Sequence, residues 1–251
     1  GASLLGLDER RTRWALGIAG SRVSGVSANT GTMTKGTHSG NAARMGLEAA
    51  LLAEQGFTAS DAVFEGHRGF NDVFFGGRLD MSLLTRDFGN PWRMVDPGLI
   101  VKRFPAQYTT HWLINAALEL RELNRLDPAD IDRVELEAAS DNPALGKGNP
   151  ATGLDGKFSA EYTAAIALLD GRVVIDSFRD ERRFAPDVVA LLPKIGVKRN
   201  PETRWADYAR TWARVTVWTR SGQCHTQRVD RPLGIWDNPL PWEGRVRKFR
   251  D

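Results

Sequence analysis

Apolar positions recur at the 3.6-residue spacing of an α-helix in the stretch from residue 41 to residue 55. Gly56 follows this stretch, at a position where helices commonly end. A second periodic stretch begins after Thr109 and Thr110, and threonine often caps a helix at its N-terminus. The pattern therefore predicts two helices with one buried face each. These faces carry Ala42, Ala43, Leu47, Ala50 and Leu51 in the first helix, and Leu113, Ala116, Ala117 and Leu120 in the second.

Weaker signals predict several shorter helices and the loops between them. The segment 4–25 has helix-like apolar spacing that glycines interrupt, and the segment 24–40, rich in Gly, Ser, Thr and Asn, is predicted as a loop. Further helices are predicted at 61–64, at 159–169 with Gly171 as the stop, and at 186–192, whereas 66–77 has no clear period and 141–156 is loop-like.

Strand signals are found mainly in the second half of the chain. Val134, Leu136 and Ala138 alternate with charged residues, which is typical of a half-buried strand. The segments 215–220 and 223–229 flank Ser221-Gly222 and predict a hairpin. Short strands are also predicted at 99–104 and 194–198, and a helical turn is predicted at Asp127-Pro128.

The predicted elements separate into two parts. Helices dominate up to about Pro97, and strands mix with helices from there to about Val229, with a loop between Pro91 and Pro97 that fits a domain boundary. Such segregation is typical of an α+β fold, unlike the regular alternation of a doubly wound parallel sheet. We therefore predict the α+β class.

Composition and charge exclude some classes of function. The chain has 34 Lys and Arg against 31 Asp and Glu, a formal charge of +3, and its basic residues form no one-faced stripe. We expect no nucleic-acid partner, whereas a small anion suits this charge. Cys224 is the only cysteine, so no intrachain disulfide is possible, and no apolar run approaches the ~20 residues that span a bilayer. A cytoplasmic protein without membrane contact is expected.

Lys35 and His38 lie on a predicted polar loop that leads directly into a helix. The free N–H groups of a first helical turn attract anions, and a cation beside them strengthens the site. Lys35 is therefore a candidate ligand for a carboxylate, or a proton shuttle if desolvation lowers its pKa. The alternative is a surface lysine and a capping histidine, and spacing alone favours that alternative.

Lys102 and His111 form a second candidate group, at a strand end that turns through Pro105 into a capped helix. Loops on rigid elements carry many catalytic residues, and Lys102 would lie beside the positive end of the helix. An ordinary corner with a solvated Lys102 is the alternative. Tyr162, after Lys157 at a loop-to-helix junction, points either into the core or towards a substrate, and the core is the safer prediction in isolation.

Other familiar sites are not indicated. His67 and His225 have no partner at metal-ligand spacing, and with one cysteine a zinc site is improbable, so no metal is expected. The glycines between Gly25 and Gly31 fit neither a phosphate-binding loop nor a dinucleotide fingerprint, and no nucleophile elbow is present.

Several ordered blocks together resemble the MmgE/PrpD family over essentially the whole chain. The first runs from Thr34-Lys35-x-x-His38-x-Gly40 to Gly56-Phe57-Thr58. The later blocks are Lys102-x-Phe104-Pro105 with His111, Lys157-Phe158-Ser159 with Tyr162, and Pro232-x-Gly234 through Asn238-Pro239-Leu240 to Lys248-Phe249.

This resemblance implies a large all-helical domain, a smaller α/β lid domain inserted into it, a homodimer, and a substrate cleft between the two domains. On this basis residues 1–97 are expected to belong to the helical domain, 98–230 to the lid, and 231–251 to a segment that returns towards the helical domain. The family includes 2-methylcitrate dehydratase, cis-aconitate decarboxylase and iminodisuccinate epimerase. No cofactor is implied.

The resemblance also implies roles for individual residues. Lys102, His38 and Tyr162 are the implied catalytic residues, and Lys35, Gln107 and His111 the implied substrate-binding residues. Two departures matter. Family chains are considerably longer, so a further part of the cleft is expected from residues outside this sequence or from a complementing chain. Gln107 replaces a histidine of the decarboxylase pattern, and glutamine exchanges no proton at neutral pH.

The resulting hypothesis is a lyase of the dehydratase type that acts on a small di- or tricarboxylic acid by abstracting a proton next to a carboxylate. The enolate-like species formed in this way needs cationic stabilisation, which Lys35 and Lys102 are expected to supply. Two alternatives stay open. One is an epimerase of an aspartate-derived dicarboxylate such as iminodisuccinate, and the other is a non-catalytic remnant or subunit of a split enzyme.

Overall fold

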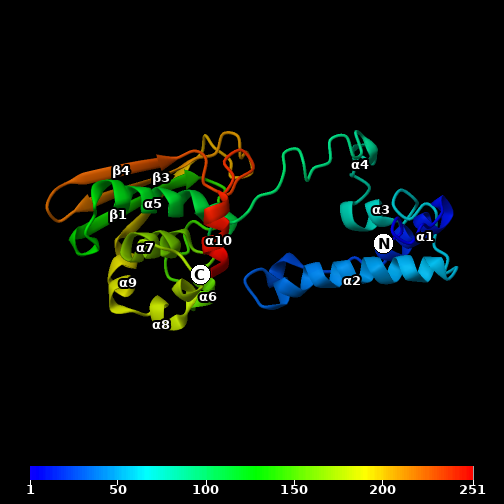
Figure 1. Cartoon of the computed structure of the whole chain (residues 1–251), viewed down its shortest axis with the longest axis horizontal. Helices are drawn as coiled ribbons and strands as arrows, with labels where there is room; N and C mark the ends of the chain where they lie inside the picture. Colours follow the sequence, from blue (N-terminus) through cyan, green and yellow to red (C-terminus); the bar gives the residue numbers. More distant parts are fainter. Residues whose placement is uncertain (251) are drawn as a thin grey trace. The chain divides into compact units, whose positions relative to one another are not determined.

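The computed structural model describes residues 1–250 and divides into two compact units, Gly1–Trp92 and Arg93–Asp251 (Figure 1). The first unit is helical. The second combines helices with a four-stranded sheet, so the predicted α+β class is confirmed. None of the helices in the described part is long and apolar enough to cross a membrane.

The first unit is built around two packed helices, α1 (Glu9–Gly20) and α2 (Thr34–Glu54). Asp8 caps α1 by accepting a hydrogen bond from the backbone N–H of Arg11 at 2.8 Å. The buried core of this unit is small and consists largely of alanine. Its members are Ala15, Ile18, Ala49, Ala50 and Ala53, with Leu5, Leu7, Trp14, Ala19, Leu52 and Ala59 packed at the edge.

Helix α2 corrects two predictions. It begins at Thr34, so the predicted loop 24–40 ends earlier than expected. Extending an existing helix by a turn costs little once it is nucleated, which explains how weak helix formers join it. The predicted buried face is right only for Ala50. Ala42, Ala43, Leu47 and Leu51 are exposed, because the buried residues of α2 all lie near its C-terminal end.

Two short helices complete this unit. They are α3 (Phe70–Phe75) and α4 (Ser82–Thr85), beside a 3-10 turn at Ser27–Asn29. The predicted helix at 61–64 is wrong, because these residues form turns, and the stretch judged to lack a period contains α3 instead. Contacts of the Phe70 ring with Phe64, Phe74 and Phe75 hold α3 by aromatic packing, which a helical period does not reveal.

The second unit contains one mixed sheet in the order β2-β1-β3-β4. Strand β1 (Ile131–Ala139) pairs in parallel with β2 (Ile195–Asn200) and antiparallel with β3 (Ala213–Thr219), which pairs antiparallel with β4 (Cys224–Val229). The predicted strands in these regions and the β3–β4 hairpin are confirmed. The predicted strand at 99–104 is wrong, because this segment joins no ladder and makes one backbone bond, from Val101 N–H to the Gly234 carbonyl at 2.8 Å.

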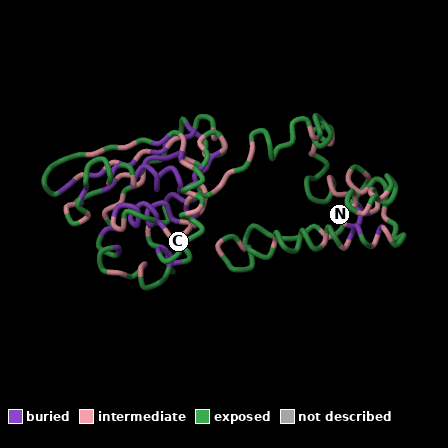
Figure 2. The backbone as a smooth tube through the Cα atoms, viewed as in Figure 1, coloured by how far each residue is buried: buried purple, intermediate pink, exposed green. Residues whose placement is uncertain are grey.

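Helices α5 (His111–Asn124) and α7 (Ala160–Asp170) pack together, and α5 also contacts β3 and β4. The predicted apolar face of α5 is confirmed, because Leu113, Ala116, Ala117 and Leu120 are all fully buried. Figure 2 shows the buried backbone concentrated along these helices and strands. The remaining elements are α6 (Gly153–Gly156), α8 (Asp180–Arg183), α9 (Pro186–Leu191), α10 (Trp242–Arg250) and 3-10 turns at Tyr108–Thr110, Pro128–Asp130, Ile175–Phe178 and Leu192–Lys194.

Candidate functional site

A tight turn in the second unit, formed by residues 102–106 and called here the lysine turn, carries the exposed side chain of Lys102. The ammonium of Lys102 donates to the Ala106 carbonyl at 3.1 Å, which closes the turn over Phe104. The ammonium of Lys248 donates to the Lys102 carbonyl at 2.5 Å. The lysine turn therefore carries the Lys102 ammonium, and the Lys248 ammonium of α10 binds its backbone.

Gly234 fixes the entry to the lysine turn. It has a φ of +102°, and a Cβ at this position would overlap the Val101 carbonyl. Glycine is therefore required both for the backbone angle and for the close approach of the two chain segments. This requirement explains the glycine in the block Pro232-x-Gly234 and connects that block physically to Lys102.

Residues 107–111, which follow the lysine turn, contain an unusual concentration of buried polar atoms without a hydrogen-bond partner in the described part of the protein. Five of the seven such side-chain atoms belong to this segment. Each such atom costs about 1–3 kcal/mol when it is desolvated, so most buried polar atoms in proteins are paired. The five atoms are Gln107 Oε1, Tyr108 Oη, Thr109 Oγ1, His111 Nδ1 and His111 Nε2.

His111 begins helix α5 and is completely buried. Its ring lies 5.2 Å from the Phe104 ring and 5.3 Å from the Tyr108 ring, measured between centroids. Burial lowers the pKa of His111 to about 3, and the positive charges of Lys102 and Lys248 lower it further, while backbone groups of Ala106 and Phe104 oppose this only partly. His111 is therefore neutral at physiological pH, where it offers one N–H donor and one acceptor nitrogen.

Tyr108 and Thr109 belong to this segment but were not among the residues that the sequence indicated. Burial raises the pKa of Tyr108, and Tyr208 and Asp237 add to the effect, so its hydroxyl is a hydrogen-bond donor at all physiological pH values. Lys248 was also missed as a site residue, although it belongs to the last of the family-like blocks. It lies in α10, 146 positions from Lys102 along the chain, so only the contact with Lys102 in the fold identifies it.

The segment 157–162 is attached to the site by its backbone. The Gln107 N–H donates to the Lys157 carbonyl at 2.8 Å, and the Lys157 ammonium lies 5.5 Å from the centre of the Phe178 ring. The structure therefore brings the Lys157 segment, which is distant in sequence, to the stretch that holds Lys102, Gln107 and His111.

Tyr162 occupies the position of a core residue. It is completely buried, its hydroxyl donates to the Ser177 carbonyl at 2.6 Å, and a Cβ at Gly156 would collide with its ring. Burial raises the pKa of Tyr162 to about 12. A hydroxyl that is held in this way has a structural role, which matches the alternative that the sequence favoured in isolation. Its catalytic role stays a prediction.

Lys35 and His38 belong to the first unit, where both lie in the first two turns of α2 instead of on a loop. Residues three apart share one face of a helix, so the two side chains are neighbours. Lys35 is exposed, whereas His38 is half-buried, with its ring so near Gly25 that a Cβ there would lie 3.1 Å from Nδ1. The expected convergence of Lys35 with Lys102 stays a prediction.

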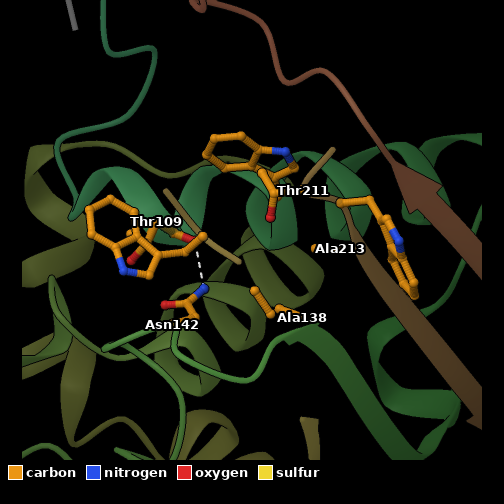
Figure 3. A pocket seen from close by; sticks show the side chains of 9 residues that line it. Thr109, Ala138, Asn142, Thr211 and Ala213 are labelled. Atoms are coloured by element: carbon orange, nitrogen blue, oxygen red, sulfur yellow. Dashed lines mark hydrogen bonds between the residues drawn. The ribbon is translucent and has the colours of Figure 1, made fainter. Parts of the chain in front are cut away.

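A small cavity lies behind residue Thr109 (Figure 3). Asn142 closes one side by donating from Nδ2 to the Thr109 carbonyl at 3.1 Å. Its volume is about 10 Å³, which accommodates about one water molecule and no carboxylic acid. The lining residues are Thr109, Trp112, Ala138, Ala139, Asn142, Trp205, Thr211, Trp212 and Ala213.

Comparison with known proteins identifies two family models along this chain. Residues 1–81 match the MmgE/PrpD N-terminal domain, and residues 104–251 match the MmgE/PrpD C-terminal domain. Within residues 1–250, no three His, Cys, Asp or Glu side chains are grouped as a metal site would require.

Enzymes with similar sequences include cis-aconitate decarboxylases from Homo sapiens and Mus musculus, which are 31% and 30% identical over 99% of this chain. The mitochondrial 2-methylcitrate dehydratase of Yarrowia lipolytica is 27% identical over 77% of the chain. The chain covers 52%, 51% and 38% of these three proteins, so it spans about half the length of the most similar ones.

Proposed function

Since the chain belongs to the MmgE/PrpD family, we propose that it forms part of the active site of a lyase that dehydrates a small di- or tricarboxylic acid. The relatives named above are decarboxylases and a dehydratase, which supports the lyase class. What is proposed beyond the lyase class is the substrate, a small di- or tricarboxylic acid, and the reaction, elimination of water.

The observation that carries the proposal is the group of buried polar side-chain atoms at residues 107–111 beside the ammonium groups of Lys102 and Lys248. Among these atoms, Gln107 Oε1, Tyr108 Oη and Thr109 Oγ1 have no hydrogen-bond partner in the described part of the chain. Removing a proton next to a carboxylate produces an enolate-like anion, and preorganised cations and hydrogen-bond donors stabilise such an anion. Lys102 supplies the positive charge in this proposal. The Gln107 amide and the neutral His111 ring supply uncharged hydrogen bonds that orient the carboxylates.

His111 is unsuited to the role of general base. A base works best when its pKa is close to the working pH, and burial holds the pKa of His111 at about 3. The role of general base, which removes the proton from the substrate, is therefore assigned to Lys102, to His38 of the first unit, or to a residue outside this sequence. Lys35 of the first unit is proposed to hold a second carboxylate of the substrate. A homodimer or a complementing chain is proposed to supply the rest of the active site.

Gln107 favours dehydration over decarboxylation. Its side-chain amide donates and accepts hydrogen bonds but has no proton to exchange at neutral pH, unlike the histidine that the decarboxylase pattern has here. Decarboxylation of cis-aconitate is the second candidate, because the more similar relatives carry that name. The two reactions release different products, water or carbon dioxide, from related acids.

The test is a proton-exchange assay in deuterium oxide with citrate, 2-methylcitrate and cis-aconitate, read by NMR. We expect deuterium to enter the carbon next to a carboxylate of a hydroxylated acid, with no release of carbon dioxide from cis-aconitate. Lys102→Ala should reduce the exchange rate by at least about 100-fold, because one cation of the anion site is lost.

Arg220→Ala is the matched control, because it removes one positive charge at the exposed β3–β4 turn and should leave exchange unchanged. Release of carbon dioxide would establish the second candidate instead. If no acid binds or exchanges, and Lys102→Ala behaves like the unmodified chain, the non-catalytic alternative is correct for this polypeptide.

A further inference from the structure

A groove of about 460 Å³ lies in the second unit between the lysine turn, the segment after α7 and helix α10, which is red in Figure 1. Its volume falls in the range of small-molecule sites. The walls are mostly apolar, since Phe104, Leu118, Val173 and Leu240 contribute to them together with Pro105, Val174, Ile175, Leu233 and Pro241.

Positive charge dominates the polar part of this groove. Arg103, Arg172, Arg247 and Lys248 line it, against one acid, Glu243. None of the four cations forms an ion pair with another residue of the described chain. Arg103 donates to the Asn115 side-chain oxygen, and Lys248 donates to the Lys102 carbonyl.

Arg103 and Arg247 lie close enough to repel each other. Burial lowers the pKa of Arg103 and the charge of Arg247 lowers it further, while Glu119 and Glu122 act in the opposite direction. Two guanidinium groups that face one groove are stabilised by an anion that both contact. The groove therefore combines an apolar floor with a rim of four cations against one acid, Glu243.

We propose that this groove binds an organic anion with one carboxylate and an apolar chain, of the kind represented by a medium-chain fatty acid. The carboxylate lies between Arg103 and Arg247, and the chain lies against Phe104, Leu118 and Leu240. A multiply charged acid suits the groove less well, because most of its wall offers no hydrogen bond.

The groove shares Lys248 with the proposed catalytic group but not its other members. Gln107 and His111 do not line the groove, and neither does the Lys102 side chain. The two sites are nevertheless connected, because Lys248 lines the groove and its ammonium holds the Lys102 carbonyl. An anion that draws Lys248 towards the groove would loosen the lysine turn, so occupancy of the groove is expected to reduce any activity that depends on Lys102.

The test is isothermal titration of the full chain with octanoate, with octanol and octylammonium as ligands that lack the negative charge. We expect octanoate to bind, and both other ligands to bind at least about tenfold more weakly. Arg247→Glu should weaken octanoate binding by at least about tenfold, whereas Arg247→Lys should retain most of it. Arg250→Glu reverses a charge on the same helix outside this groove and should leave the affinity unchanged.

Circular dichroism and thermal melting of each variant show whether α10 is intact, and Arg247 is exposed, so no loss of folding is expected. Equal binding of octanoate and octanol would reduce the groove to an apolar surface and overturn the proposal. Equal losses of octanoate affinity in Arg247→Glu and Arg250→Glu would overturn it as well, because the total charge of α10 would then explain the binding without a site at Arg247. These measurements need no catalysis, so they stand apart from the outcome of the exchange assay.

Discussion

Helices α2 and α5 both carry apolar residues at helical spacing but differ greatly in what covers them. Helix α2 has 21 residues, of which Ala49, Ala50 and Ala53 are buried. Helix α5 has 14 residues, of which eight are buried, because it packs against α7 on one side and against β3 and β4 on another. The comparison shows that a periodic apolar face predicts a helix, whereas its burial depends on the elements that pack against it.

The same difference extends to the two units. The second unit has a continuous core that includes both faces of α7, while the first unit leaves large apolar side chains exposed on its helices and on the segments between them. Examples of these exposed side chains are Leu16, Leu47, Leu51, Phe57, Val73, Phe74 and Phe88. Comparable mutations in the two units should therefore change the unfolding free energy by different amounts.

The largest difference is expected between two leucine truncations, Leu120→Ala in α5 and Leu51→Ala in α2. Leu120 is completely buried, so its truncation should cost about 3 kcal/mol of unfolding free energy, whereas Leu51 is 43% exposed and should cost less than about 1 kcal/mol. Urea denaturation of the two variants measures this. Equal losses would mean that another surface covers α2 in solution and would end the comparison drawn above.

A histidine in each unit provides the second comparison. The pKa of His111 is about 3 in the folded state, below the ordinary value of about 6.5, so the unfolded chain takes up a proton first as the pH falls. This residue should therefore reduce stability by about 2 kcal/mol between pH 7 and pH 5. His111→Phe should remove that pH-dependent loss, while His38→Phe should leave it in place. Denaturation midpoints at both pH values decide the matter, and a loss that persists in His111→Phe would contradict the assignment.

Two tyrosines of the second unit differ in hydrogen bonding: the hydroxyl of Tyr162 has a partner, and the hydroxyl of Tyr108 has none in the described part of the chain. Tyr162→Phe should cost about 1–2 kcal/mol, because the Ser177 carbonyl loses its buried donor. Tyr108→Phe should cost nothing or stabilise the fold, since the Tyr108 hydroxyl has no partner in the described part of the chain. Thermal unfolding provides the measurement. If Tyr162→Phe instead keeps full stability and loses exchange activity, its predicted catalytic role is supported and the structural one is not.

The smallest effect is expected at the surface of α2. Glu48 accepts hydrogen bonds from Arg22 at 3.0 Å and from Arg44 at 2.7 Å, but all three side chains are at least one-third exposed. Solvent and salt screen such pairs, so Glu48→Gln should change the unfolding free energy by less than about 1 kcal/mol. Glu137→Gln is the matched variant in the sheet, where the carboxylate is buried beside Arg214 and Lys198 and its loss should cost more. Equal costs for the two variants would argue against a difference in solvation between the units.

Much of the second unit was predictable from local sequence. The alternation around Leu136 predicts β1, the Ser221-Gly222 turn predicts the β3–β4 hairpin, and the segment 159–169 with the Gly171 stop predicts α7. Each of these signals operates between residues that are near each other in sequence. The segment before α5 was misjudged as a strand, because a strand needs a partner ladder and no local pattern reveals whether that partner exists.

The candidate site was predictable in part. Lys102, Gln107 and His111 follow one another closely in sequence, so the family-like block indicates all three. Tyr108 and Thr109 were missed because polar and aromatic residues in a turn are common, and their significance comes from burial without a partner.

The sequence by itself determined the α+β class, the main helices and strands of the second unit, and the membership in a family, because these depend on local periodicity and on ordered blocks of residues. Tertiary structure alone decided that His111 is neutral, that Tyr162 bonds to Ser177, and that Lys248 holds the lysine turn. The physical reason is that desolvation and hydrogen-bond pairing depend on which distant segments pack together. Those contacts join residues up to 146 positions apart, beyond the range of any local pattern.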